Sequence, residues 1–166
     1  MQLLLVRHAI ACDIDPLRWP RDTLRPLTAR GMRRMQRAAK GFTWLTLAPQ
    51  RVCVSPLLRA TQTAAILEHG ADWPAAKIWP ALAPAAPLAR LLRELASLRD
   101  ERVALIGHQP QLGRLLGRLL TEGGMPACEF RKGGAACVSF SGAVRPGKGR
   151  LLWLMPPRAL RRLARS

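Results

Sequence analysis

Three short apolar runs constrain the fold of this chain more than any other feature, because a polar residue ends each run and a helical pattern follows. We expect strands at residues 2–6, 51–54 and 103–106. The runs are too short for helices and suit strands that are buried on both faces of a sheet. Strands that alternate with helices favour a parallel sheet, so the three strands would end at the same edge. The sequence therefore predicts an α/β fold whose polar strand ends meet where open α/β sheets bind ligands.

Two helix starts follow the first two strands. Thr28 is a good N-cap, and the helix after it has a predicted buried stripe at helical spacing. The stripe comprises Met32, Met35, Ala39 and Phe42. Serine followed by proline is typical of a helix start, so Ser55 and Pro56 predict a second helix that runs to about Glu68. Arg59 falls in the first turn of this helix, which makes its N-terminus a candidate anion site.

The second half of the chain supplies two more helices and the edge of the sheet. Leucines at helical spacing predict helices over residues 88–98 and 112–120. A short strand is expected near 77–79. The β-prone runs 135–140 and 151–154 flank glycine-rich turns and predict a hairpin or meander at the sheet edge.

Length and composition favour one globular domain. A chain of 166 residues, 49% of them hydrophobic, can bury a core without disulfides or a metal. We expect one domain over residues 1–157 and a basic C-terminal tail over 158–166, a short helix that packs Leu160 and Leu163 on the body. No apolar run approaches the roughly 18 residues that span a bilayer, and no signal peptide is evident, so we expect a cytoplasmic protein without membrane contact.

Cysteines and surface charge predict neither a zinc site nor a nucleic-acid partner. The cysteines form no C-x-x-C pair, and Cys53 and Cys137 lie in apolar runs typical of buried thiols. The formal net charge of +17 would attract polyanions. Its arginine runs, however, lie on the polar sides of predicted helices, and no nucleic-acid-binding motif accompanies them. We interpret the charge as a solvated arginine-rich surface.

Four side chains at the strand ends form a candidate anion pocket. They are Arg7, His8, Arg59 and His108. No carboxylate cluster for magnesium and no phosphate-binding P-loop accompanies them, so we expect neither a metal nor another cofactor. A neutral imidazole is a good nucleophile toward phosphorus, and two arginines can bind phosphoryl oxygens in bidentate fashion. A protonated His108 would donate to the same oxygens, and water would later cleave the phospho-His8 intermediate.

Further substrate-binding candidates lie beside these four. They are Ser55 and Gln109 at the strand ends, and Asp13 and Asp15 in the loop 9–26. That loop is rich in proline, which excludes a long helix, and a loop of this length in a compact domain is usually functional. We expect it to line or cover the site.

Three segments resemble the signature blocks of the histidine phosphatase (phosphoglycerate mutase-like) superfamily. They are Leu5-Val6-Arg7-His8-Ala9, the stretch 55–64 that begins Ser-Pro-Leu-Leu-Arg, and Gly107-His108-Gln109-Pro110. The short length and Arg25-Pro26-Leu27-Thr28 resemble the SixA-type phosphohistidine phosphatases in particular. The resemblance implies a minimal three-layer α/β/α sandwich around a mostly parallel sheet. It also implies that His8 is the phosphorylated nucleophile and that Arg7, Arg59 and His108 bind the phosphate.

Two departures from the family pattern bear on the substrate. Ala9 stands where glycine is usual, which is tolerable if the backbone φ there is negative. Larger members carry a glutamate general acid after the second block, whereas residues 81–87 of this chain contain no acid. Hydrolysis of an alkyl ester needs a proton for its leaving group, whereas a phosphoramidate nitrogen can be protonated before cleavage. The missing acid therefore favours phosphohistidine on a partner protein, although Asp13, Asp15 or Asp22 remains a possible proton source.

Two alternatives stay open on the sequence alone. One is a phosphatase that acts on small sugar or nucleotide phosphates, for which an arginine excess would suit a multiply charged substrate. The other is a non-catalytic module that binds phosphorylated or polyanionic partners, as the net charge suggests. The presence of His8 argues against the second, because a binding module has no need of a nucleophile.

Overall fold

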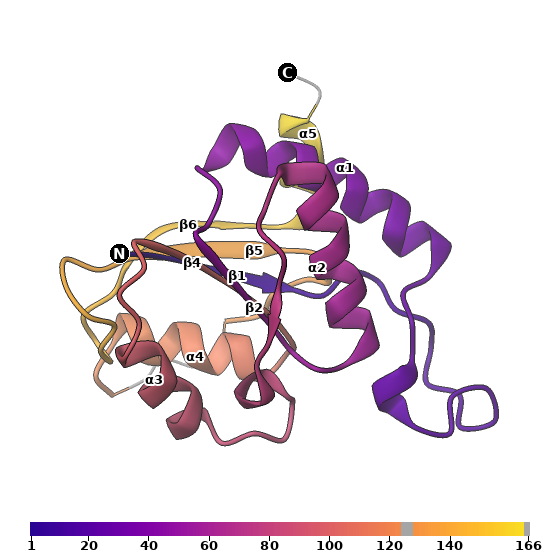
Figure 1. Cartoon of the computed structure of the whole chain (residues 1–166), viewed down its shortest axis with the longest axis horizontal. Helices are drawn as coiled ribbons and strands as arrows, with labels where there is room; N and C mark the ends of the chain where they lie inside the picture. Colours follow the sequence, from indigo (N-terminus) through magenta and orange to yellow (C-terminus); the bar gives the residue numbers. More distant parts are fainter. Residues whose placement is uncertain (124–127, 165–166) are drawn as a thin grey trace.

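A computed structural model describes residues 1–123 and 128–164 and contains one six-stranded sheet (Figure 1). Its order is β3-β2-β4-β1-β5-β6. The parallel strands are β1 (Gln2–Arg7), β2 (Arg51–Val54), β3 (Lys77–Ile78) and β4 (Arg102–Gly107). The strand β5 (Ala135–Ser139) runs antiparallel to β1, and β6 (Arg150–Met155) runs antiparallel to β5. The predicted mostly parallel sheet with an antiparallel edge is confirmed.

Helices cover both faces of the sheet and complete the predicted three-layer sandwich (Figure 1). One face carries α1 (Ala29–Leu45), α2 (Leu58–Ala71) and α5 (Pro157–Leu163), and the other carries α3 (Leu88–Ala96) and α4 (Gln111–Leu120). Two short 3-10 helices, η1 (Asp22–Leu24) and η2 (Pro80–Leu82), lie in the connections. Within the described ranges, no helix has the length and apolar character needed to cross a membrane.

The central strands contribute to two separate cores. Along β1, Leu4 and Val6 pack in the core under α1, α2 and α5, whereas Leu3 and Leu5 pack in the core under α3 and α4. All four side chains are fully buried. Because successive side chains of a strand point to opposite faces, a strand between two layers must be apolar throughout. This packing explains the uninterrupted apolar runs and fixes the strand ends that carry the polar residues.

The first helix begins as predicted but buries a slightly different stripe. The Thr28 Oγ1 accepts a hydrogen bond from the Gly31 amide at 2.9 Å, which is the expected N-cap. Met32 is 37% exposed, so its predicted place in the core is wrong. It lies just beyond one margin of the buried arc, whereas Ala38, which was not in the predicted stripe, lies near the centre of that arc and is buried.

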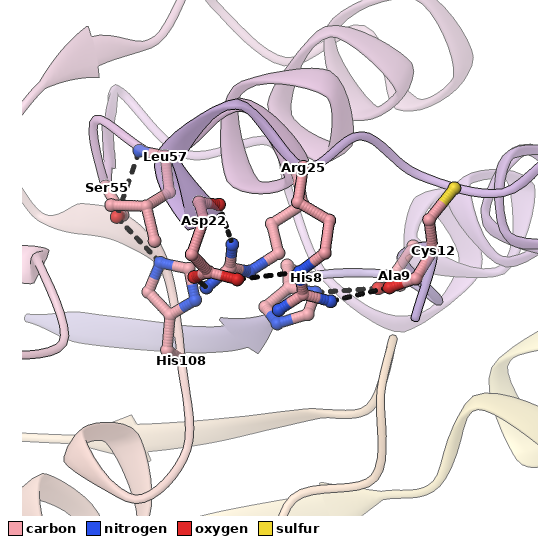
Figure 2. A network of polar contacts seen from close by, with 9 residues as sticks. His8, Ala9, Cys12, Asp22, Arg25, Ser55, Leu57 and His108 are labelled. Carbon is pink, nitrogen blue, oxygen red and sulfur yellow. Dashed lines mark hydrogen bonds and ion pairs between the residues drawn. The ribbon is translucent and has the colours of Figure 1, made fainter. Parts of the chain in front are cut away.

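The second helix begins two residues later than predicted and ends later as well. It starts at Leu58 after an N-cap, Leu57, that makes no side-chain cap, and it runs to Ala71 instead of ending near Glu68. The predicted cap residue Ser55 is fully buried, and its hydroxyl is hydrogen-bonded to His108. The same hydroxyl accepts a longer hydrogen bond of 3.4 Å from the Leu57 amide, so Ser55 joins the start of α2 to His108 rather than capping the helix as predicted (Figure 2).

The C-terminal helix α5 packs tightly against α1 through its one fully buried side chain. Leu160 is fully buried in the core beneath α1, as predicted, whereas Leu163 is half-buried. Gly41 of α1 permits this close approach, because a Cβ at that position would lie 2.0 Å from the Leu160 carbonyl oxygen. The helices α1 and α5 thus lie side by side on one face of the sheet (Figure 1).

Candidate active site

Three neighbouring parallel strands bring the predicted polar residues to one edge of the sheet. Arg7 is the last residue of β1 and His8 follows it, while His108 follows β4 and Ser55 follows β2. The His8 amide donates to the Gly107 carbonyl at 3.0 Å, and the Ser55 amide donates to Ile106 at 3.0 Å. The ring centroids of His8 and His108 are 5.0 Å apart. We call this cluster the strand-end pocket; it comprises Arg7, His8, Arg59 and His108.

His8 is held in the form that a nucleophile needs. Its Nδ1 donates to the carbonyl oxygen of Ala9 at 2.7 Å, so in the neutral ring the Nε2 carries the lone pair. The side chain is only 6% exposed. Burial lowers the pKa of His8 to about 4; the hydrogen bond to Ala9 opposes this shift, and the charges of Arg59 and Arg7 add to it. His8 is therefore neutral, with a free Nε2 lone pair, at pH 7.

His108 is buried beside His8 and is also neutral at pH 7. Its Nε2 lies 2.7 Å from the Ser55 hydroxyl, on the side of the ring away from His8 (Figure 2). Its Nδ1 is buried and has no hydrogen-bond partner within the described part of the chain. Burial, followed by the charges of His8 and Arg59, lowers the pKa of His108 to about 3. Without substrate, His108 is therefore not the protonated donor that the sequence predicts, because it is desolvated and lies near positive charges.

Two buried arginines give the strand-end pocket its positive charge. Arg7 donates from Nη1 to the carbonyl of Phe130, and Arg59 is buried in the first turn of α2, as predicted. The Nε atoms of both guanidinium groups have no partner among the residues that the structure describes. Burial lowers the pKa of both arginines, although a guanidinium stays charged near neutral pH. Unsatisfied, desolvated guanidinium donors of this kind favour a bound oxyanion.

The loop before α1 contributes one carboxylate to the pocket. Asp22 Oδ2 lies 3.0 Å from Arg59 Nη2, and Asp22 Oδ1 accepts a hydrogen bond of 2.7 Å from Arg25 Nε (Figure 2). Arg25 is anchored in turn by donating to the Cys12 carbonyl at 2.6 Å. Burial raises the pKa of Asp22, but the hydrogen bond from Arg25 and the charge of Arg59 outweigh this and lower it overall. The predicted role of the loop 9–26 in lining the pocket therefore rests on Asp22.

Sequence reasoning missed two residues that hold the pocket together. Arg25 entered it only as part of a family motif, and its side chain positions Asp22. Thr63 accepts a hydrogen bond from the Ala9 amide at 3.0 Å and donates to the Arg59 carbonyl at 2.7 Å. It therefore ties the end of β1 to the first turn of α2. Its spacing of four residues from Arg59 on one helix was the available signal.

The structure leaves three predicted substrate-binding residues away from the polar contacts of the pocket. Asp13 is exposed, and Asp15 uses Oδ1 to accept the amides of Leu17 and Arg18, which closes a local turn. Gln109 donates from Nε2 to the Cys128 carbonyl at 2.7 Å, so it supports the neighbouring loop. Ser55, in contrast, reaches the pocket through His108.

The departure at Ala9 is compatible with the backbone. Among non-glycine positions of the described ranges, only Asp72 has a positive φ, so Ala9 has the negative φ that an alanine needs. The alanine is buried behind His8, and its amide and carbonyl are both hydrogen-bonded. Substitution of the usual glycine therefore leaves the nucleophile's support intact.

Potential metal ligands do not gather at the site. Over residues 1–123 and 128–164, no group of three or more His, Cys, Asp and Glu side chains is arranged to hold a metal ion. The cysteines Cys53 and Cys137 are buried as predicted, and burial raises the pKa of the Cys53 thiol to about 12.

Comparison with known proteins agrees with this geometry. The family model described as Histidine phosphatase superfamily (branch 1) matches residues 3–84. The phosphohistidine phosphatase SixA of Escherichia coli is 30% identical over 161 residues, which cover 95% of this chain and 94% of that protein. An uncharacterised protein of Picosynechococcus sp. is 37% identical over 116 residues, covering 68% of this chain and 69% of that protein.

Solved structures show the same fold. The structure of the protein histidine phosphatase SixA complexed with tungstate has a TM-score of 0.85 at 28% identity and covers 96% of this chain and 99% of that one. The structure of the alpha-ribazole phosphatase from Shigella flexneri has a TM-score of 0.64 at 19% identity, covering 89% of this chain and 96% of that one, and it supports the fold alone. With the site geometry, these matches show that the chain is a phosphatase and belongs to the histidine phosphatase superfamily.

Proposed function

We propose that this protein hydrolyses phosphohistidine on a signalling or phosphotransfer protein through a phospho-His8 intermediate, without a metal. One observation carries the proposal: His8 is buried and neutral, and its hydrogen bond to Ala9 leaves Nε2 as the free nucleophile beside two arginines. The match to SixA of Escherichia coli supports the choice of substrate class.

In the first step, His8 Nε2 attacks the phosphorus of the substrate. A P–N bond forms to His8 as the P–N bond to the substrate histidine breaks, and the substrate imidazole leaves with the electron pair of that bond. Arg7 and Arg59 bind the phosphoryl oxygens and stabilise the charge that spreads over them. The negative charge of the phosphoryl group favours protonation of His108, so substrate binding itself would create the donor that burial otherwise suppresses.

In the second step, water attacks the phosphorus of phospho-His8. The P–N bond breaks, its electron pair returns to Nε2, and inorganic phosphate leaves with the oxygen of the water. The low pKa of His8 makes its neutral ring a good leaving group and returns the nucleophile ready for the next cycle.

The state of Asp22 supports phosphohistidine over an alkyl ester. It is the one carboxylate that contacts an arginine of the strand-end pocket within the described residues, and its pKa is lowered. An ionised Asp22 has no proton to give to an alkoxide at neutral pH, whereas an imidazole leaving group can take its proton from solvent before cleavage. We therefore assign Asp22 the role of holding Arg59 and Arg25.

A small-molecule phosphate ester is the second candidate, and the position of Asp22 is what favours it. The carboxylate is half-exposed at the pocket, where a bound phosphoryl group would raise its pKa toward that of a general acid. A dianionic ester would then keep Asp22 protonated, and Asp22 could serve as the general acid that is missing from residues 81–87.

A substrate panel tests the proposal. Full-length protein with EDTA present is assayed on free phosphohistidine, p-nitrophenyl phosphate and glycerol phosphate. We expect kcat/KM for phosphohistidine to exceed that for glycerol phosphate by at least about 100-fold, the lower range for one general acid. A preference for glycerol phosphate would overturn the proposal in favour of the ester phosphatase.

The variant Asp22→Asn separates the two roles of this residue. Asparagine keeps the shape but can neither hold Arg59 by charge nor donate an acid proton. If Asp22 only holds Arg59, hydrolysis of phosphohistidine stays within about tenfold of wild type. A loss of about 100-fold or more on glycerol phosphate, with phosphohistidine hydrolysis little changed, would instead identify Asp22 as the general acid for esters.

A further inference from the structure

A second cationic pocket lies beside the first, between α1 and α5. It has a volume of about 410 Å³ and is walled by these two helices and the loop 131–133. Five of its lining residues are cations: Arg34, Arg131, Lys132, Arg158 and Arg161. Its floor is apolar and includes Met35 and Ala38. We call it the α1–α5 pocket.

The cations of the α1–α5 pocket have no anionic partner. No Asp or Glu lines the pocket, and none of its five cations forms an ion pair anywhere in the part of the chain that the structure describes. Some arginines elsewhere on the surface are paired, as Arg51 is with Asp100 at 2.9 Å and Arg90 with Glu94 at 2.8 Å, and other exposed arginines form no ion pair within the described ranges. What sets this face apart is that five cations left unpaired by the described residues line a single pocket.

The packing of α5 on α1 forces these like charges together. Burial lowers the pKa of Arg161, and the charges of Arg34, Arg37 and Arg158 lower it further. Repulsion of this kind costs free energy that a bound anion recovers. The apolar floor also removes water from one side of the pocket, which strengthens each contact with an anion.

The α1–α5 pocket adjoins the end of β1 that carries the strand-end pocket. Ala9 and Ile10, which directly follow His8, form part of its lining. The amide of Gly133, at the end of the cationic loop, donates to the carbonyls of His8 and Arg7 at 3.0 and 3.2 Å. The loop is thereby fixed to the end of β1, and the charge of Lys132 in this loop contributes to the lowered pKa of His8, so the two sites are near neighbours.

We infer that the α1–α5 pocket binds carboxylate side chains of the phosphoprotein substrate, close in space to the phosphohistidine that enters the strand-end pocket. This inference rests on the proposed function. The pocket contains no aromatic side chain on which a base could stack, which is the usual platform for single-stranded nucleic acid. Its small volume holds a few carboxylates against five cations. The pocket would therefore select protein substrates that carry acidic residues around the phosphohistidine.

Matched peptides test the inference. Two nine-residue peptides carry a central phosphohistidine, with aspartate at the flanking positions of one and asparagine at those of the other. We expect kcat/KM for the aspartate peptide to exceed that for the asparagine peptide by about tenfold at low salt, from several partly exposed charge pairs. The ratio should approach one at 1 M NaCl, where the Debye length is about 3 Å.

A pair of variants assigns the effect to this pocket. Arg34→Gln/Arg158→Gln removes two of its cations, and Arg93→Gln/Arg114→Gln removes two exposed cations from α3 and α4 on the other face. Both lower the net charge equally. The first should bring the ratio of the two peptides close to one, whereas the second should keep it. Equal kcat/KM values for the two peptides in wild type would overturn the inference. So would an equal loss of the preference for the aspartate peptide in both double variants.

Binding of the unphosphorylated peptides, measured by calorimetry, keeps this test independent of turnover. Wild type should bind the aspartate peptide about tenfold more tightly than Arg34→Gln/Arg158→Gln does. If free phosphohistidine is not hydrolysed, the proposed function fails, while this binding measurement still decides the role of the pocket. Tighter binding of a nine-nucleotide oligothymidylate than of the aspartate peptide, lost in the same variant, would overturn the inference in favour of nucleic acid.

Discussion

The strand-end pocket and the α1–α5 pocket are both cationic, yet they hold their charges in different ways. In the strand-end pocket, Arg59 is buried and held by Asp22, and the rings of His8 and His108 are buried and neutral. In the α1–α5 pocket, exposed Arg158 and half-buried Arg161 project from a helix and meet no acceptor among the described residues. The difference teaches that rigid, desolvated groups at strand ends suit chemistry, whereas unpaired cations on helices suit recognition.

The largest effect expected within this comparison comes from Arg59. The substitution Arg59→Ala removes a guanidinium that binds the phosphoryl oxygens as charge develops, so kcat/KM for free phosphohistidine should fall by about 10³-fold. The matched control is Arg93→Ala, an exposed arginine of α3, which should stay within about twofold of wild type. A loss below tenfold for Arg59→Ala would contradict the assignment of this residue to the phosphate.

The next effect concerns stability against pH and tests how deeply the two histidines are desolvated. The pKa values of His8 and His108 in the folded protein, about 4 and about 3, lie below the usual 6.5. The unfolded chain therefore binds more protons as the pH falls from 6.5 toward 4, and the folded state loses stability over that window. Each histidine contributes about 1.4 kcal/mol per pH unit, so the free energy of unfolding should fall by about 2 to 3 kcal/mol between pH 6 and pH 5.

Urea unfolding at pH 7, 6 and 5 measures this slope. The double variant His8→Asn/His108→Asn has lost both rings and should lose most of the dependence in that window. An unchanged urea midpoint between pH 6 and pH 5 in wild type would mean that the two histidines keep their usual pKa in the folded protein. That result would contradict the assignment of His8 as a desolvated, neutral nucleophile.

The smallest effect concerns the packing of α5 on α1, because α5 forms one wall of the α1–α5 pocket. The substitution Gly41→Ala places a Cβ 2.0 Å from the Leu160 carbonyl oxygen, so the helix must shift. We expect a loss of about 1 to 3 kcal/mol and a drop of several degrees in Tm. Gly142→Ala adds the same methyl group where no atom lies within 4 Å, and it should change Tm far less. Equal Tm values for the two variants would contradict the close packing of α5 against α1 at Gly41.

Much of the strand-end pocket could be predicted from the sequence because its determinants are local. Apolar runs specify strands buried on both faces, and chain direction then places Arg7, His8 and His108 at one edge. Arg59 was predictable from its place in the first turn of a helix. These residues lie on, or directly after, regular elements, so the order and direction of those elements place them together.

The interactions that sequence reasoning missed depend on contacts between distant segments. Asp22 was one of three loop acids, and only the fold of the loop brings it to Arg25 and Arg59. Ser55 carries the same local signal as a helix cap, but His108 from another strand engages its hydroxyl. The cations of α1 and α5 each look like a solvated face, and their juxtaposition depends on the packing of α5.

Trapping of the phosphorylated enzyme tests the nucleophilic role of His8 most directly. Full-length protein is mixed with phosphoramidate, quenched in alkali within one turnover and digested, and the peptides are analysed by mass spectrometry. We predict a phosphoryl group on His8 that is stable in alkali, lost in acid, and absent from His8→Asn, which should also lose at least about 10³-fold in kcat. Turnover at the wild-type rate in His8→Asn, or full activity with no phosphoryl group on His8, would contradict the account.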